Sequence, residues 1–237
     1  MDLDVASAFT FQKQQKLLVK GSLHPRQKPK NLLENLRSST LENKNLKLDV
    51  SIQDQEFKLH FHNKVSEIQD EISFSMRYYE SYQDITDQVS GAYIFKPKSP
   101  KSLLYGSKKE ITGIFVGKLV QQFSLKSSDE EGFNSFAKVR LADSHLEFEI
   151  LLDSIPGDDW LGQGKEVVAS WRSTKKFEEN VFYTDTNGLE MQKRILNFRP
   201  SWNFTQTDLA SGNYYPVNSA IAIKNQNIQM TVMNDRS

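Results

Sequence analysis

Two pairs of nearby carboxylates have residue types that could act on a glycosidic bond. Glu147 and Glu149 stand two residues apart in an alternating segment, and Asp158 and Asp159 directly precede Trp160. Glycoside hydrolysis usually needs two carboxyl groups, and an aromatic ring can pack against a sugar. The alternation of apolar and polar residues is enough to explain Glu147 and Glu149, because polar residues occupy the solvent-exposed face of a half-buried strand. The aspartates fit an ordinary loop better than a catalytic pair.

A second arrangement with possible chemistry is a pair of histidines. His60 and His62 lie two apart, so on a strand both would face the same side, where Asp54 or Glu56 could join them around a metal ion. Leu59 takes the opposite, apolar face in the same alternation. The pattern therefore favours two histidines on a solvated strand face, and we predict no metal site in this chain.

Tyrosines stand out in two further segments. Tyr93 follows small residues in the segment 90–97, and Tyr214 and Tyr215 adjoin in the segment 212–218. A tyrosine presents a ring face to sugar C–H groups and a hydroxyl to sugar hydroxyls. Taken on their chemistry alone, these rings more often fill the edges of a β-sandwich.

The chain also carries one modification signal and lacks several catalytic ones. Asn203-Phe204-Thr205 is an acceptor for N-glycosylation if the chain enters the secretory pathway. No phosphate-binding glycine loop and no GxSxG nucleophile elbow occurs. Cysteine is absent, which excludes disulfides, cysteine zinc sites and thiol nucleophiles within the chain.

Composition narrows the class of partner. The 237 residues include 30 Lys and Arg and 30 Asp and Glu, so the formal net charge is zero. A balanced chain has no global field to hold a polyanion, and we expect no nucleic-acid partner. No apolar run reaches the roughly 20 residues that span a bilayer, and the first residues do not read as a signal peptide. We expect no membrane association.

Several segments alternate apolar and polar residues and must be strands that position any site. In each of these segments every second residue is apolar, which places one apolar face on a strand. The alternating segments are 46–52, 57–61, 72–78, 137–141, 146–152 and 228–232. Asn187-Gly188 accepts positive φ at both centres of a type I′ turn, so we predict a hairpin between strands at 181–184 and 191–195. The predicted fold is an all-β, antiparallel β-sandwich.

Six blocks of sequence occur in a specific order: SGAYIFKP, GKEVV, FYTDTNGLEMQKR, RPSWN, GNYYPVNS and MTVMNDRS. In this order and spacing they resemble the C-terminal β-sandwich region of the glycoside hydrolase family 38 α-mannosidases, especially the lysosomal type. The resemblance covers residues 45–237, and residues 1–44 are expected to be a polar linker or a poorly packed leading segment.

The resemblance implies a retaining, zinc-dependent exo-mannosidase that trims α-linked mannose from N-glycans in the lysosome or another secretory lumen. In the family, the zinc ligands and the two catalytic aspartates lie on a preceding (β/α) barrel, and a galactose-mutarotase-like supersandwich follows. We therefore expect zinc only in the complete enzyme and the catalytic barrel as the partner. Family members continue past the position of Ser237, so we expect the sandwich to be incomplete at its C-terminus and a substrate-reaching arginine to be missing.

The resemblance also assigns roles to individual residues. It implies that Tyr93 reaches into the barrel site and bonds a mannose hydroxyl, and it makes Tyr214 and Tyr215 weaker substrate-binding candidates. The sequon at Asn203 matches a position where relatives carry sequons. The Asn187-Gly188 hairpin is similar to a family hairpin with a structural role only.

Three functions remain open from the sequence. The first is a non-catalytic part of an α-mannosidase that packs on the barrel and completes the mannose pocket. The second is a free-standing carbohydrate-binding module with Tyr93, Trp160, Tyr214 and Tyr215 as its platform. The third is a truncated fragment without autonomous function. Flanking coding sequence and glycan titration would separate them.

Overall fold

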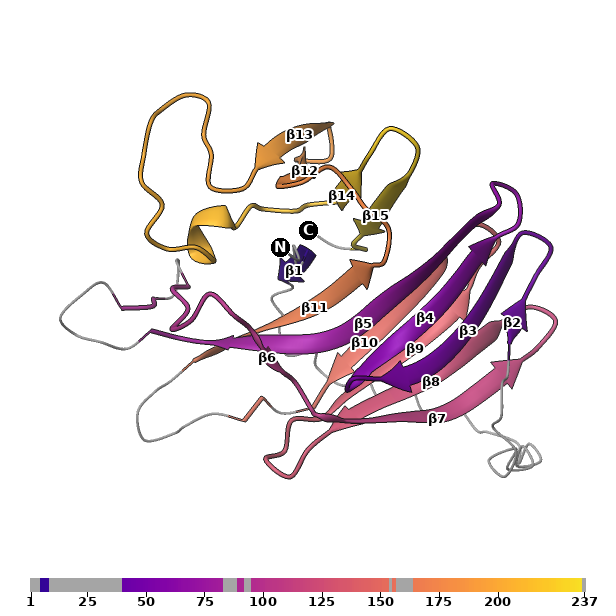
Figure 1. Ribbon diagram of the computed structural model, residues 1–237. Coiled ribbons are helices and arrows are strands. Elements are labelled where there is room, and N and C mark those ends of the chain that lie inside the picture. The colour runs from indigo at the N-terminus through magenta and orange to yellow at the C-terminus, as the bar shows by residue number, and fades with distance from the viewer. Residues whose placement is uncertain are drawn as a thin grey trace.

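The computed structural model describes residues 5–8 (backbone), 40–82, 89–91, 95–153, 155–156 and 164–235. Within these ranges the chain forms three antiparallel sheets and no α-helix, which confirms the predicted all-β sandwich (Figure 1). A short 3-10 turn, Ser211–Asn213, interrupts a loop late in the chain. No helix in the described part of the chain is long and apolar enough to cross a bilayer.

The first sheet is the largest, and it contains strands from both ends of the chain. In spatial order it consists of β1 (Val5–Ala8), β11 (Lys165–Ser173), β5 (Ile68–Glu80), β4 (Glu56–Asn63), β3 (Leu46–Gln53) and β2 (Leu41–Glu42), and β6 (Leu103–Leu104) also pairs with β5. β1 and β2 belong to the first 44 residues, and most of that segment lies outside the described residues.

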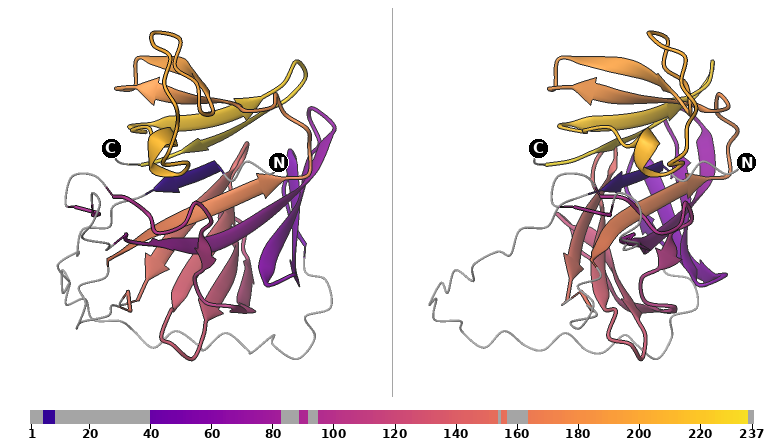
Figure 2. Two further views of the ribbon diagram at one scale, coloured as in Figure 1. Left: turned by 60° about the vertical axis from the view of Figure 1, so that its left-hand side comes forward. Right: turned by 90° about the vertical axis from the view of Figure 1, so that its left-hand side faces the viewer.

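The second and third sheets have four strands each. The second has the order β10 (Leu146–Leu152), β9 (Ser135–Leu141), β8 (Gln121–Ser128) and β7 (Lys108–Val116). The third has the order β13 (Glu190–Ile195), β12 (Val181–Thr186), β14 (Ala220–Lys224) and β15 (Gln229–Met233). Figure 2 shows the third sheet, in orange and yellow, above the end of the sandwich where β1 and β11 lie.

Alternation in the sequence determines which face of each strand is buried. In the β3–β4 pair, Leu48 lies opposite Phe61 and Val50 lies opposite Leu59, so the apolar residues of both strands share one face. That face packs against the apolar face of the second sheet, where Phe123 and Leu125 of β8 are each 1% exposed. Burial of apolar area between the two sheets is the main source of stability of such a sandwich.

An aromatic cluster joins the two sheets at the centre of the core. The ring of Phe74 on β5 lies 5.1 Å from Phe148 on β10 and 5.5 Å from Trp171 on β11. Phe148 meets Trp171 edge to face at 5.5 Å. Offset and edge-to-face pairs of this kind add to the gain from burial alone.

The predicted hairpin around Asn187-Gly188 is present in the third sheet. β12 and β13 pair antiparallel, with Thr184 opposite Gln192. Asn187 has φ of 49° and Gly188 has φ of 71°, the left-handed conformation that a type I′ turn requires at both central positions. The other alternating segments of the sequence also lie within β3, β4, β5, β9 and β10, and the segment 228–232 lies within β15 except for Ile228, which directly precedes it.

Candidate functional site

Two tyrosine-bearing loops come together at one end of the first sheet. Lys96, from the segment between β5 and β6, places its Nζ 3.9 Å from Oδ1 of Asp208, which precedes the 3-10 turn. The same ammonium lies 4.6 Å from the ring centroid of Tyr82. Figure 1 shows the 3-10 turn, in gold, close to the magenta segment that follows β5. Blocks more than a hundred residues apart in the sequence thus become neighbours.

Described residues on either side of Tyr93 in the sequence are joined by backbone hydrogen bonds. The Tyr82 N–H donates to the carbonyl of Lys96 at 2.8 Å, and the Ser90 N–H donates to the carbonyl of Tyr82 at 3.0 Å. The hydroxyl of Ser90 accepts from the Lys96 N–H at 3.0 Å. Tyr93 itself lies outside the described residues, as do Asp158, Asp159 and Trp160.

At the same end, Glu166 and Tyr79 lie side by side on the outer face of the first sheet. Glu166 begins β11 and is the pairing partner of Tyr79 on β5. Their neighbours Val167 and Tyr78 point to the buried face, so Glu166 and Tyr79 point away from the core. Burial raises the pKa of the Glu166 carboxyl above its ordinary value.

Tyr214 directly follows the 3-10 turn and is partly buried. Burial, followed by the charges of Tyr79 and Glu166, raises the pKa of the Tyr214 phenol far above its ordinary value. Tyr214 is 41% exposed, so part of the residue faces solvent.

Tyr215 has a different environment from Tyr214, although the two are adjacent. The guanidinium groups of Arg194 and Arg199 lie 4.5 Å and 4.9 Å from its ring centroid, and Phe182 meets it edge to face at 5.4 Å. Cations over an aromatic face are attracted by its quadrupole. Tyr215 therefore packs the loop onto the third sheet, and its ring is already in contact with protein groups.

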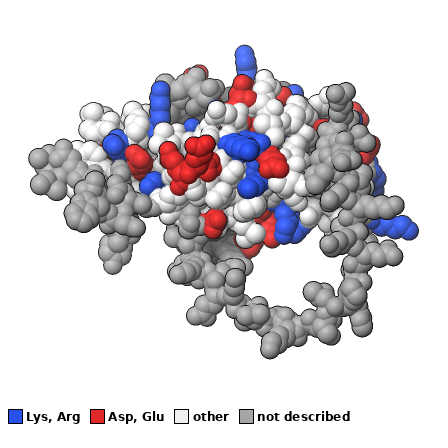
Figure 3. Space-filling view, turned by 90° about the horizontal axis from the view of Figure 1, so that it is seen from below, with Lys and Arg blue, Asp and Glu red and all other residues white. Residues whose placement is uncertain are grey.

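The glutamate pair on β10 is engaged in ion pairs. Glu149 lies 2.9 Å from Lys138 and 2.5 Å from Arg140, and Glu147 lies 3.6 Å from His145. The hydrogen bond from Lys138 and the charges of the two cations lower the pKa of Glu149. A general acid needs a raised pKa, so Glu149 is unsuited to that role. Figure 3 shows acidic and basic side chains close together on the face seen from below.

The histidine pair on β4 makes contacts with neighbouring polar side chains. His60 lies 2.9 Å from the hydroxyl of Ser51 and 3.6 Å from Glu71, and His62 lies 3.4 Å from Glu67. Glu56, the expected helper, is buried and pairs with cations on β4, β5 and β11. Among the described residues, no three His, Asp or Glu side chains are grouped to hold a metal ion. The described histidines and carboxylates of this chain therefore do not fit a zinc ion.

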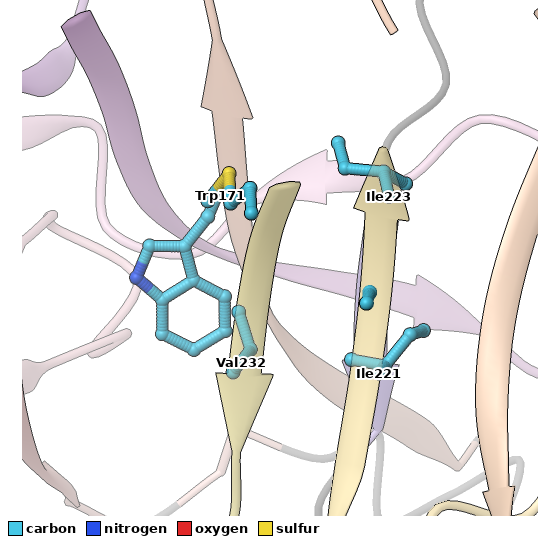
Figure 4. A pocket seen from close by; sticks show the side chains of 6 residues that line it. Trp171, Ile221, Ile223 and Val232 are labelled. Carbon is cyan, nitrogen blue, oxygen red and sulfur yellow. The ribbon is translucent and has the colours of Figure 1, made fainter. Parts of the chain in front are cut away.

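A small apolar pocket lies between the third sheet and β11. Figure 4 shows the indole of Trp171 beside Val232 of β15, with Ile221 and Ile223 on the neighbouring strand β14. The lining holds no polar group that could orient a sugar, and polar groups are what give a ligand pocket its specificity. We interpret it as a gap in sheet packing.

The predicted glycosylation acceptor is exposed. Asn203 lies in the loop between β13 and the 3-10 turn, between two aromatic residues. The rings of Trp202 and Phe204 stack on each other at 5.1 Å, and Arg199 lies 5.6 Å from the ring of Phe204. The side chain of Asn203 is thus open to solvent in a loop that ring contacts hold in place.

Sequence reasoning missed Glu166 as a candidate residue. Its segment reads as a buried run, and strand β11 buries residues on both faces from Val167 to Trp171. A single carboxylate at the start of such a run does not indicate a functional site by itself. The electrostatic surroundings of Glu166 include Tyr79 and Tyr214, which are distant in sequence. The Lys96–Asp208 contact could not be predicted either, because it needs the fold to bring two loops together.

The fold defines an antiparallel β-sandwich whose loops gather polar and aromatic side chains at one end, the usual place for a binding site in this architecture. Residues 41–237 match the Glycosyl hydrolases family 38 C-terminal domain. The chain therefore belongs to this family of C-terminal domains, as the sequence blocks predicted.

Individual relatives agree with this assignment. The chain is 40% identical over 159 residues to the lysosomal alpha-mannosidase of Bos taurus, and 37% identical over 158 residues to that of Felis catus. Each match covers 65% of this chain and 15% of the relative. The lysosomal alpha-mannosidase of Dictyostelium discoideum is 36% identical over 201 residues, which cover 83% of this chain and 19% of the relative. The chain thus spans a small part of the relatives that it matches.

Proposed function

We propose that this chain is the non-catalytic β-sandwich portion of an α-mannosidase that hydrolyses α-linked mannose of N-glycans. The observation that carries the proposal is the family match over residues 41–237, which corresponds to a C-terminal domain in relatives named alpha-mannosidases. In this proposal the catalytic barrel of the same enzyme is the partner and holds the zinc that the resemblance implies. The described residues of this chain provide no comparable metal ligands.

The physical role in this proposal is to complete a mannose pocket built mainly on the barrel. Tyr93 provides a hydroxyl that bonds a mannose hydroxyl, an assignment that rests on the resemblance of the GAYIF block. Support comes from its flanks, because Ser90 and Lys96 are fixed by hydrogen bonds, and Lys96 also contacts Asp208 of the loop before the 3-10 turn. A rigid support of this kind is what a substrate-contacting side chain needs.

The proposal also includes the cellular compartment of the protein and the glycosylation of Asn203. The relatives named lysosomal suggest the lysosome or another secretory lumen for this chain. In that setting Asn203 would be glycosylated, because it is exposed and lies in an acceptor triplet.

One observation favours a second candidate function, a free-standing carbohydrate-binding module. Trp202 is 62% exposed and stacks on Phe204, and an exposed, supported indole is a suitable surface for a sugar ring. Such a module would bind a glycan by itself with useful affinity. A supporting portion of an enzyme would show no binding at millimolar mannose.

The length of the native polypeptide, and the enzymatic activity associated with it, test the main proposal. An antibody raised against this chain should detect, in extracts of the source organism, a polypeptide several times longer than 237 residues or a complex that carries zinc-dependent α-mannosidase activity. A free polypeptide of this length, without associated mannosidase activity, would contradict the proposal and favour the binding module.

A further inference from the structure

The turn between β7 and β8 exposes a contiguous group of large apolar side chains. The group consists of Phe115, Val116, Leu119 and Val120, which are 55%, 64%, 98% and 42% exposed. Single exposed apolar residues are normal on a protein surface, whereas a contiguous group marks a surface that another molecule covers. We call these four side chains the apolar tip, and they form a candidate interaction surface.

The hairpin that carries the apolar tip is fixed in place. The Gly117 N–H donates to the Val120 carbonyl at 2.8 Å and closes the turn. At the base of the hairpin, the side-chain amide of Gln121 accepts from the backbone N–H of Glu42 on β2 at 2.9 Å and donates to the Glu42 carbonyl at 2.8 Å. In Figure 1 this turn lies at the end of the sandwich where β2 is drawn. A surface that is fixed before its partner arrives loses little conformational entropy on binding.

The apolar tip has side chains on both faces of the hairpin. Phe115 and Val116 are consecutive residues of β7, so their side chains point to opposite faces. A Cβ atom at Gly117 would lie 2.8 Å from a ring carbon of Phe115, so the glycine lets this ring pack directly against the turn. A hairpin end that is apolar on both faces is buried more completely by insertion into a groove than by contact with a flat surface.

The charges near the apolar tip narrow the kind of partner. Lys118 is the single charged residue in the segment 115–122. The carboxylate of Glu42, at the base of the hairpin, is paired with Lys64 at 2.6 Å. Anionic membrane surfaces attract clusters of basic residues, and one lysine does not form such a cluster. The fitting partner is therefore a neutral, apolar groove on a protein.

The length of the relatives indicates which protein could provide this groove. The matched segments make up 15% and 19% of the lysosomal alpha-mannosidases of Felis catus and Dictyostelium discoideum. Most of the polypeptide in these relatives thus lies outside the segment that this chain matches. In the proposed enzyme, the remainder of the same polypeptide is the protein surface that is always available to the apolar tip.

We propose that the apolar tip inserts into an apolar groove on another part of the same enzyme polypeptide. This inference rests on the proposed function, because only a larger enzyme provides that part. The docking surface is separate from the segment around Tyr93. Glu42 aligns through β3 and β4 with Gln69 at the start of β5, whereas Lys96 bonds to Tyr82 beyond the other end of β5.

Leu119→Asp tests the proposal in both the 237-residue chain and the complete enzyme. Leu119 is exposed in the chain, so the variant chain should unfold at the temperature of the parent chain. In the complete enzyme the new carboxylate would be buried without a partner. The unfolding temperature of the complete enzyme should therefore fall by several degrees, and its mannosidase activity should be lost sooner on heating.

Leu189→Asp is the matched control, because it changes another exposed leucine in a hairpin turn. Leu189 is 86% exposed and lies between β12 and β13, on the third sheet. This variant should leave the unfolding temperatures of both the chain and the complete enzyme unchanged. A loss of stability specific to Leu119→Asp, and present only in the complete enzyme, separates docking from a general effect of an added charge.

Hydroxyl-radical footprinting measures the coverage of the apolar tip directly. Phe115 and Leu119 should react readily in the 237-residue chain and be strongly protected in the complete enzyme. Full reactivity in the complete enzyme, or an unfolding temperature of the Leu119→Asp enzyme equal to that of the parent enzyme, would overturn the proposal. Binding to lipid vesicles, or association of two enzyme molecules, that Leu119→Asp abolishes would also overturn it, because the tip would then contact a membrane or a second copy.

The failure of this proposal can be distinguished from the failure of the proposed function. If the native polypeptide proves short and carries no mannosidase activity, the enzyme assignment fails, and the docking proposal fails with it before any variant is made. If the native protein is a full mannosidase in which Leu119 stays reactive, the enzyme assignment stands and only the docking proposal fails.

Discussion

Oδ1 of Asp185 accepts a hydrogen bond of 2.8 Å from the backbone N–H of Asn218, which joins two distant blocks of the family sequence. The same oxygen accepts from Ser219 and Ala220, and Oδ2 accepts from Gly188 at 2.7 Å in the hairpin turn. One carboxylate therefore links the Asn187-Gly188 turn to the start of β14, directly after the loop that carries Tyr214.

Asp185→Asn should destabilise the protein, because an amide cannot accept from both sides as a carboxylate does. Hydrogen bonds from the backbone, led by that of Ser219, hold the pKa of Asp185 well below its ordinary value. A lowered pKa means that the stabilisation is complete above about pH 4 and is lost as pH falls through the folded-state pKa. Chemical denaturation as a function of pH should show the largest difference between parent and variant near neutral pH.

The exposed Asp143, in the turn between β9 and β10, provides the control for this prediction. Asp143→Asn should leave the unfolding midpoint near that of the parent at every pH. Equal stability of Asp185→Asn and the parent at neutral pH would show that the carboxylate bonds contribute nothing.

Phe74→Ala should be among the most destabilising single changes in the core. Phe74 is 1% exposed, and it contacts Phe148 of the second sheet and Trp171 on the neighbouring strand β11. Removal of a buried phenylalanine side chain costs about 3–5 kcal/mol of the free energy of unfolding, through lost burial and a cavity. Phe136→Ala, at a position 43% exposed on β9, should cost far less in the same urea titration. Similar losses for both variants would contradict the placement of the core.

Glu166→Gln should raise stability at neutral pH. Burial raises the pKa of this carboxyl, so its charged form is the costly one in the folded state. The pH dependence of stability is therefore opposite to that of Asp185. The free-energy cost of holding the charged Glu166 carboxylate in the folded state is absent while the group is protonated, and it appears as pH rises through the folded-state pKa. Thermal unfolding should therefore show a gain for the variant at neutral pH that shrinks in acid. A variant less stable than the parent at neutral pH would show that the carboxylate has a stabilising partner.

Tyr93→Phe should lower mannosidase activity of the assembled enzyme without changing its fold. The change removes one hydrogen bond to substrate, on the order of 1 kcal/mol, which corresponds to roughly a fivefold loss in kcat/KM. Steady-state kinetics with an aryl α-mannoside measure the loss, and circular dichroism checks the fold. Identical kinetics of variant and parent would show that the assignment of Tyr93 is wrong.

The local part of this fold was predictable from the sequence. Alternation places Leu48 and Val50 on a buried face without knowledge of their partners, because side chains on a strand repeat every second residue. The positive φ of Asn187 and Gly188 follows from the residue types alone. In both cases the relevant physics acts within a few residues.

The long-range part was not predictable. Alternation does not specify that β11 pairs with both β1 and β5, or that the strands divide into three sheets. The pairing of Glu166 with Tyr79 arises only after this division, since the two residues lie on different strands. The contrast between Tyr214 and Tyr215 also needs the fold, which brings Arg194 and Arg199 over the second ring.

The most direct test of the central claim is hydrolysis of p-nitrophenyl α-mannoside by the purified chain, with added zinc, before and after it is combined with the barrel-bearing portion of the enzyme. The account predicts no release of nitrophenol by the chain alone and zinc-dependent release by the combination. Zinc-dependent turnover by the 237-residue chain alone, in preparations free of any barrel-bearing polypeptide, would contradict it.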